Sequence, residues 1–275
     1  MRVNKLNETK IVLAILESGT IELNKDKIDI SGSLSMFKSK EYRKEDLDEI
    51  TLGGRSDKQP KVHILACGSG DIPFKDEFKH NKVCILNFAS SKHPGGGFIT
   101  GAHAQEENLC YHSNLYKALQ KHESFYEYNR NNLRKALYTD GIIYTENVLF
   151  FRQNFMNTIP RFADVITCAA PNRGAALRNG VKEIDIQRTM SRRLEQILKV
   201  AIENGNKNLV LGAFGCGVFR NDLEFVATEI KRLLTVKGYG KYFDNIILPA
   251  LKKDGNEYST FINVFRGFPN LFIED

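Results

Sequence analysis

The stretch from Asn87 to Tyr116, NFASSKHPGGGFITGAHAQEENLCYHSNLY, contains the most specific pattern of the chain. It begins with an apolar segment, passes through three consecutive glycines and continues into a predicted helix that opens with two adjacent carboxylates. Three consecutive glycines are unfavourable inside a helix or a strand because each loses much backbone entropy on ordering. They favour a loop that approaches a ligand closely and turns its N–H groups towards an anion. We therefore predict a phosphate-bearing ligand over residues 95–97, with its reactive end at Glu106 and Glu107.

Short apolar segments alternate with helical patterns from residue 61 onward. Several of the segments are continuously apolar, as is typical of strands buried on both faces of a sheet. The alternation predicts an α/β fold with a mostly parallel or mixed sheet, in which ligands bind outside the carboxyl ends of the strands. The predicted strands are 62–66, 82–88, 142–151, 164–169, 209–213 and 245–249, and the predicted helices are 105–122, 184–204 and 222–236.

Residues 1–60 differ from the rest of the chain because they are charged and irregular. We expect them to form an N-terminal accessory region packed on a core domain of residues 61–275, with one helix around residues 7–17. The run of mixed charge at residues 38–46 is expected to be a solvated helix or loop.

Composition narrows the class of protein and its location. No apolar run approaches the roughly 20 residues that span a bilayer, so we expect no membrane association. The five cysteines form no C-x-x-C pair, which argues against a disulfide framework and a structural zinc site and indicates a reduced, cytoplasmic protein. A net charge of +6 favours polyanionic partners such as nucleotides or their polymers.

The adjacent carboxylates Glu106 and Glu107 are candidates for catalysis. Neighbouring residues on a helix point about 100° apart, so one carboxylate can hold sugar hydroxyls while the other faces a scissile bond. A general acid at this position needs burial or a like-charged neighbour to raise its pKa. The alternative is that both are helix N-terminal acids that only complement the helix dipole.

A second glycine loop, LGAFGCGVFRND at residues 211–222, also follows an apolar strand and precedes a helix. Gly215 and Gly217 permit close approach to a phosphate, and Phe219 offers a ring face for stacking on a sugar or base. The alternative is a structural turn with a core phenylalanine. Cys216 has no histidine at a telling local spacing, so we do not expect it to be a nucleophile. Asn172, after the strand at 164–169, is either a substrate ligand or a turn residue.

The segment at 87–116 closely resembles the signature of poly(ADP-ribose) glycohydrolases of the bacterial or microbial type, which is a GGG followed by QEE at this spacing and an S-x-LY tail. GAFGCGVFRND resembles the second, diphosphate-binding loop of that family, and VITCAAPN resembles the strand between the two. The resemblance implies a macrodomain, a three-layer α/β/α fold with a mixed, mostly parallel central sheet and an N-terminal helical accessory region. It also implies hydrolysis of the ribose–ribose O-glycosidic bonds of poly(ADP-ribose) to release ADP-ribose, without metal or cofactor.

The resemblance further implies the roles of individual residues. Glu107 would be the catalytic acid and base, and Glu106 would position the ribose next to the cleaved bond. The other implied substrate-binding residues are Asn87, Ser90, Gly95, Gly96, Gly97, Gln105, Gly215, Cys216, Gly217, Val218 and Phe219.

Two alternatives remain open at this point. One is a non-catalytic ADP-ribose-binding macrodomain, against which the presence of both Glu106 and Glu107 counts. The other is a hydrolase of mono-ADP-ribosylated protein or nucleic acid, nucleic acid being expected only as an ADP-ribosylated substrate. Residues 108–112, NLCYH, lack the arginine that microbial members usually carry there. A cation lost near the pocket would alter substrate choice or weaken polymer binding.

Overall fold

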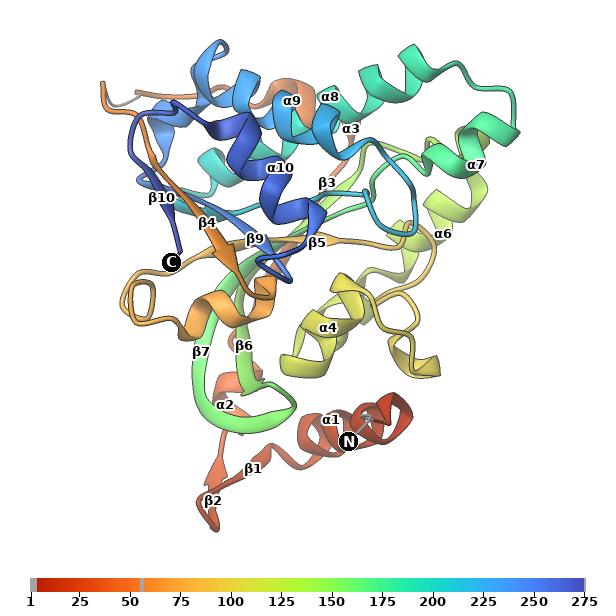
Figure 1. Ribbon diagram of the computed structural model, residues 1–275. Coiled ribbons are helices and arrows are strands. Elements are labelled where there is room, and N and C mark those ends of the chain that lie inside the picture. The colour runs from red at the N-terminus through yellow and green to blue at the C-terminus, as the bar shows by residue number, and fades with distance from the viewer. Residues whose placement is uncertain (1–3, 55–56, 275) are drawn as a thin grey trace.

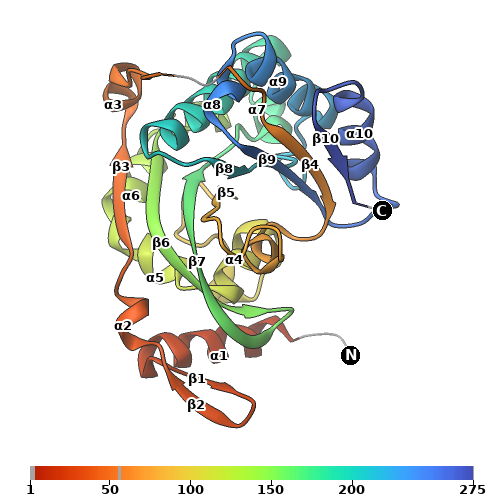
Figure 2. The same cartoon turned by 90° about the vertical axis from the view of Figure 1, so that its left-hand side faces the viewer.

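The computed structural model describes residues 4–54 and 57–274 (Figure 1). Its main sheet has eight strands in the order β10-β4-β9-β8-β5-β7-β6-β3 (Figure 2). Neighbours from β10 to β7 run parallel, whereas β6 is antiparallel to both β7 and β3. The prediction of a mixed, mostly parallel sheet is therefore confirmed. The strands are β3 (Lys38–Tyr42), β4 (Lys61–Ala66), β5 (Cys84–Phe88), β6 (Ile142–Gln153), β7 (Met156–Cys168), β8 (Asn208–Val210), β9 (Asn245–Ala250) and β10 (Leu271–Ile273).

Helices cover both faces of this sheet, which confirms the three-layer α/β/α architecture. Successive side chains of a strand point to opposite faces: Cys84 and Leu86 of β5 pack in one apolar cluster and Ile85 in the other. The first cluster includes side chains of α3 (Lys44–Glu49), α8 (Glu183–Glu203), α9 (Leu223–Thr235) and α10 (Asn256–Phe265). The second includes side chains of α1 (Lys5–Ser18), α2 (Ser31–Leu34), α4 (Gln105–His112), α5 (Leu115–Leu119) and α6 (Glu123–Asn131).

The remaining elements are short. A hairpin of β1 (Thr20–Leu23) and β2 (Asp26–Asp29) follows α1, and α7 (Arg173–Arg178) lies between β7 and α8. The 3₁₀ helices are η1 (Ser69–Phe74), η2 (Phe98–Thr100), η3 (Gln120–His122), η4 (Arg134–Ala136) and η5 (Tyr239–Tyr242). No helix in the described ranges has both the length and the apolar character needed to span a membrane.

The N-terminal region contributes to the main sheet. The helix expected around residues 7–17 is present as α1, but the expected solvated helix or loop at 38–46 is wrong for its first half, because residues 38–42 form the edge strand β3. Only Tyr42 of this strand is fully buried, so the sequence lacks the apolar pattern that would predict a strand paired with β6. Charged side chains on an edge strand also disfavour pairing with another chain. The proposed division at residue 60 stays a prediction, and residues 1–3 and 55–56 lie outside the described part.

The single helix expected over 105–122 is divided into α4, α5 and η3. Ser113 is extended, and its hydroxyl accepts a hydrogen bond from the N–H of Leu115 at 3.1 Å. The side chain of Asn114 accepts from the N–H of Leu149 in β6 at 2.8 Å and donates to the carbonyl of Leu34 at 3.1 Å. These side chains offer the backbone an alternative to continuing the helix.

Candidate active site

A cavity of about 490 Å³ lies at the carboxyl ends of five neighbouring strands, from β4 to β7. Its walls come from residues 67–69 after β4, 88–90 at the end of β5, Ala170 after β7, residues 213, 215 and 217–219 after β8, and Pro249 and Leu251 at the end of β9. The start of α4 forms a further wall. The cavity thus occupies the edge at which the alternation of strands and helices predicts a ligand.

The cavity brings together nine of the thirteen predicted site residues. The other four, Asn87, Gly95, Gly97 and Cys216, do not line it. The nine lining residues are Ser90, Gly96, Gln105, Glu106, Glu107, Gly215, Gly217, Val218 and Phe219.

Glu107 is held by backbone donors on both oxygens. Its Oε1 accepts from the N–H of Gly97 and its Oε2 from the N–H of Ala104, each at 2.8 Å. The second bond caps α4, as the alternative interpretation expected, yet the carboxylate also faces the cavity and is only 7% exposed. Glu107 therefore combines a helix-capping position with a fixed place in the cavity wall.

Glu106 is more deeply buried, at 3% exposure, and is held by different partners. Its Oε2 accepts from the N–H of Ser90 at 2.7 Å, and its Oε1 accepts from the side-chain amide of Asn87 at 3.2 Å. Burial raises the pKa of Glu106 to about 8, and the charge of Glu107 adds to this rise, while the hydrogen bonds from Ser90 and Asn87 oppose it. The pair of carboxyls therefore retains one proton near neutral pH.

The first glycine loop holds these carboxyls rather than offering free donors to a phosphate. The N–H of Gly97 is bonded to Glu107, that of Gly95 to Glu106, and that of Gly96 to the carbonyl of His93 at 3.1 Å. In this structure the N–H groups of residues 95–97 are therefore not free for the phosphate that the sequence predicts there, because they already donate to oxygens of the protein itself.

A glycine is nevertheless required at position 96, because the side chains of Glu106 and Glu107 lie close to its backbone. Its φ is +60°, and a side-chain carbon at this position would lie within 2.8 Å of oxygens of both Glu106 and Glu107. Only glycine satisfies both conditions.

The second glycine loop does have free donors. Among the described residues, the N–H groups of Gly215, Gly217, Val218 and Phe219 have no hydrogen-bond acceptor. Gly217 faces open space, and Val218 is 80% exposed. Successive unoccupied N–H groups in one turn are what an anion-binding concavity requires, and the binding of an anion here stays a prediction.

Gln105 serves the strand as well as the cavity. Its Oε1 accepts from the N–H of Phe88 and its Nε2 donates to the carbonyl of Leu86, each at 2.8 Å. The side-chain amide thus extends the hydrogen bonding of β5 and fixes the start of α4 beside the strand end.

The residues after the carboxylate pair, where the sequence lacks an arginine, contribute little to the cavity. Of residues 108–112, only Asn108 lines the cavity. Tyr111 is fully buried, and the ring of His112 is bonded to the carbonyl of Asn108 at 2.7 Å and to the N–H of Phe155 at 3.2 Å. The effect of the missing arginine on substrate choice stays a prediction.

Sequence reasoning missed one side of the cavity, formed by residues 67–69, His103, Asn108, Leu251 and Glu257. They come from separate parts of the chain: Asn108 belongs to α4 and Glu257 to α10, and only His103 and Asn108 lie within the segment at 87–116. Asn172 does not line the cavity, and its side chain caps α7 by accepting from the N–H of Ala175 at 3.0 Å. Within residues 4–54 and 57–274, no group of three His, Cys, Asp or Glu side chains is placed to hold a metal ion.

The three-layer fold, the buried carboxylate pair and the turn with free N–H groups fit a class of protein, the glycoside hydrolases that act through a pair of carboxyl groups. The family described as "Microbial-type PARG, catalytic domain" matches residues 9–153, and the chain belongs to this family. PARG stands for poly(ADP-ribose) glycohydrolase, a glycoside hydrolase.

Solved structures of bacterial poly(ADP-ribose) glycohydrolases resemble the chain over nearly its whole length. The enzyme from Thermomonospora curvata is 29% identical, with a TM-score of 0.87 over 95% of this chain and 99% of that one. Its complex with the inhibitor ADP-HPD is also 29% identical, with a TM-score of 0.84 over 94% and 98%. The enzyme from Deinococcus radiodurans in complex with ADP-ribose is 30% identical, with a TM-score of 0.76 over 88% and 100%. No curated protein sequence matches the chain.

Proposed function

We propose that the chain releases ADP-ribose from poly(ADP-ribose) by hydrolysing the ribose–ribose O-glycosidic bond, with Glu106 and Glu107 as its reactive groups. One observation carries this proposal. Two carboxyls held by different donors face the same cavity as a turn with four free N–H groups. This arrangement supplies an anion site for the diphosphate and a proton-carrying pair for the glycosidic bond.

The diphosphate is proposed to bind the turn at residues 215–219. Backbone N–H groups bind phosphate oxygens well because they are fixed in direction and need no counter-charge. Position 215 has no room for a side chain, because a side-chain carbon there would lie 2.7 Å from the amide nitrogen of Asn221. The ring of Phe219, which lines the cavity, is proposed to pack against the ligand.

The chemistry requires a proton for the leaving oxygen. Glycoside hydrolysis passes through an oxocarbenium-like transition state. With substrate bound, Glu107 is proposed to carry the single proton of the pair, to donate it to the leaving O2′ as the bond between O2′ and C1″ breaks, and then to take a proton from the water that attacks C1″. Atoms and charge balance, because Glu107 regains the proton that it gave.

Glu106 has a different proposed role. In the free site its raised pKa of about 8 keeps the proton on Glu106. When the substrate binds, this proton is proposed to pass to Glu107, and the carboxylate of Glu106 then accepts a hydrogen bond from a ribose hydroxyl. A single proton on the pair leaves one negative charge, rather than two, beside a ligand that carries a diphosphate. Asn87 and the N–H of Ser90 orient this carboxyl.

The substrate is proposed to be poly(ADP-ribose), with ADP-ribose as the product and nucleic acid only as an ADP-ribosylated substrate. We propose a cytoplasmic location because all five cysteines are free thiols: Cys67, Cys84, Cys110, Cys168 and Cys216. The division into residues 1–60 and 61–275 remains our proposal for the domain boundary.

The test compares release of ADP-ribose from ribose–ribose, protein–ribose and nucleic-acid–ribose linkages at equal concentrations of ADP-ribosyl groups. The proposal predicts the highest kcat/KM for purified poly(ADP-ribose). A higher value for mono-ADP-ribosylated protein or nucleic acid would contradict the substrate assignment. ADP-ribose binding without release from any of the three would contradict the assignment of catalysis.

A further inference from the structure

Three segments meet beside Phe219, the residue that lines the cavity at the end of the anion-binding turn. The N–H of Gly174 in α7 donates to the carbonyl of Phe219 at 3.1 Å, and the N–H of Asn172 donates to the carbonyl of Ala136 at 2.9 Å. The ring of Tyr138 lies 6.0 Å from that of Phe219. The segment around η4, the start of α7 and the turn after β8 therefore form one surface that begins at the cavity wall.

This surface carries four exposed cations, Arg134, Lys135, Arg178 and Arg220, which we call the basic platform. None of the four has an ion-pair partner among the described residues.

Two of these cations converge on one point. A side-chain carbon placed on Gly174 would lie 3.2 Å from Cδ of Arg220 and 3.7 Å from Nη1 of Arg178. The neighbouring Glu183 does not neutralise them, because it binds Nε of Arg173 at 2.8 Å. The positive charge of the platform is therefore available to a partner.

The platform is built on strained backbone. Arg134, Lys135 and Arg220 have φ values of 45°, 53° and 61°, and the adjoining Ala136 and Tyr138 have values of 72° and 62°. Each left-handed residue other than glycine costs on the order of 1 kcal/mol, and such residues cluster at functional sites. Three of the four platform cations thus sit where the backbone alone would not place them.

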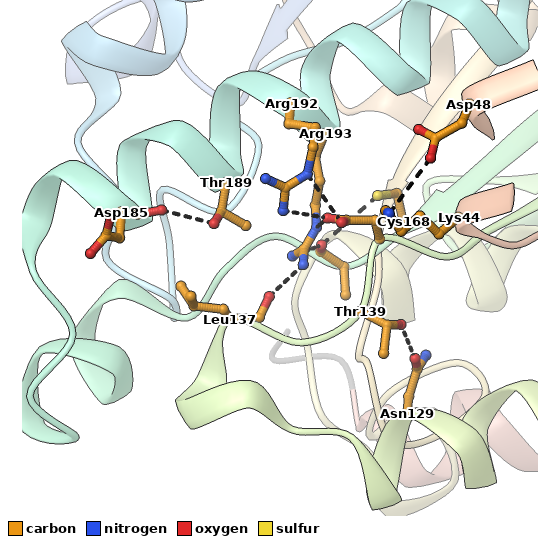
Figure 3. Close-up of polar contacts among 12 residues, drawn as sticks. Lys44, Asp48, Asn129, Leu137, Thr139, Cys168, Asp185, Thr189, Arg192 and Arg193 are labelled. Atoms are coloured by element: carbon orange, nitrogen blue, oxygen red, sulfur yellow. Dashed lines mark hydrogen bonds and ion pairs between the residues drawn. The ribbon is translucent and has the colours of Figure 1, made fainter. Parts of the chain in front are cut away.

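Two arginines of α8, of which Arg193 is buried and Arg192 exposed, hold this strained segment in place. Arg193 is fully buried and donates to the carbonyls of Ala169 and Leu137, and to Asp140 at 3.3 Å. Arg192 binds both oxygens of Asp140 at 3.0 Å. Figure 3 shows Arg192 and Arg193 reaching from α8 with Leu137 nearby. A surface held in one conformation loses little entropy when it binds a partner.

We propose that the basic platform binds diphosphate groups of the poly(ADP-ribose) chain that lie outside the cavity. This inference rests on the proposed function, since a chain with one unit in the cavity must cross its rim. Each repeat of the polymer carries a diphosphate, and the guanidinium group matches phosphate oxygens in geometry and charge. Arginine supplies three of the four cations.

The test measures binding in the Glu107→Gln background, so that the polymer stays intact. Arg178→Gln and Arg220→Gln are combined in it, and affinities for labelled long polymer and for ADP-ribose are measured over a range of salt concentrations. The matched control combines Lys25→Gln and Lys27→Gln, two exposed lysines at the β1–β2 hairpin, on the opposite side of the molecule from α7 (Figure 1).

The platform variant is expected to bind long polymer about 10-fold more weakly at low salt, with a shallower dependence of affinity on salt. Its affinity for ADP-ribose and its thermal unfolding midpoint should not change, and the control should match the parent. Unchanged polymer affinity would overturn the inference. So would equal losses for polymer and ADP-ribose, because the change would then act on the cavity.

A single-stranded DNA of the same total charge is the competitor that tests the choice of partner. Equal affinity for DNA and polymer, with equal losses in the platform variant, would overturn the assignment to poly(ADP-ribose).

Failure of the proposed function and failure of the platform proposal give different results. Absence of ADP-ribose release by the unmodified enzyme contradicts the proposed function, whereas normal release with unchanged polymer affinity of the platform variant contradicts only the platform.

Discussion

Replacing Glu106 by glutamine is expected to remove a pH-dependent destabilisation that the buried carboxyl imposes on the folded state. Burial raises the pKa of Glu106 to about 8, whereas a glutamate in an unfolded chain titrates near 4.3. The folded state therefore binds the proton more tightly than the unfolded state does. This tighter proton binding stabilises the folded state fully below the unfolded pKa, and the stabilisation is lost as the pH rises towards 8.

The size of the effect follows from the two pKa values. One pKa unit corresponds to about 1.4 kcal/mol, so this group alone lowers the free energy of unfolding by about 3.5 kcal/mol between about pH 5 and pH 8. A glutamine keeps an acceptor for the N–H of Ser90. Its amide group also meets Asn87, whose Oδ1 is buried without a partner in the described part of the chain. A rotated Asn87 amide would accept from the new donor.

The assay is urea unfolding of both proteins across this pH range, with Glu127→Gln, at an exposed position of α6, as the control for the change of residue type. The free energy of unfolding of Glu106→Gln should exceed that of the parent by about 3 kcal/mol more at pH 8 than at pH 5. Parallel pH dependences of the two proteins would refute the argument that Glu106 is protonated in the folded state.

Three further substitutions test the surroundings of the site. Gly96→Ala forces a side chain onto both catalytic carboxyls at a left-handed position, so we expect turnover to fall by about 100-fold or more, and a near-normal kcat would contradict the close approach. Arg193→Met leaves Asp140 and two buried carbonyls without this donor, so urea unfolding should show a loss of about 3–5 kcal/mol; a loss below about 1 kcal/mol would show that Arg192 suffices. Thr9→Val removes the bond of 2.7 Å from α1 to the carbonyl of Phe98, which should cost about 1 kcal/mol in the same assay, whereas Thr9→Ser should retain most of it.

Sequence patterns located the central strands because those strands are apolar on both faces and therefore unbroken. The same rule misses β3, whose sequence KSKEY looks like a solvated segment. Its strand conformation comes from pairing with β6, a partner about 100 residues away in the chain, and pairing of this kind leaves little trace in a charged edge strand. The break in the helix at Ser113 has the same origin, since Asn114 binds β6 and the carbonyl of Leu34.

The sequence predicted which residues form the candidate site better than it predicted the hydrogen bonds that they make. The spacing of the glycines and of Glu106 and Glu107 singled out a segment that lines the cavity, but it did not show which N–H groups remain free. Gly97 meets Glu107 ten positions later through a loop whose path depends on the whole fold. The basic platform could not be predicted at all, because its cations come from residues 134–135, 178 and 220, which only the tertiary structure brings together.

Release of free ADP-ribose from purified poly(ADP-ribose), measured for the unmodified protein and for Glu107→Gln, tests the central claim most directly. The account predicts release by the unmodified protein and a loss of kcat of about 100- to 10,000-fold in the variant, the range of general acid–base catalysis. Calorimetry should show that the variant still binds ADP-ribose, because the free N–H groups of residues 215–219 are untouched. Near-normal turnover by Glu107→Gln would contradict the assignment of the catalytic acid and base, and binding of ADP-ribose without any release by the unmodified protein would contradict the claim that this chain is the hydrolase.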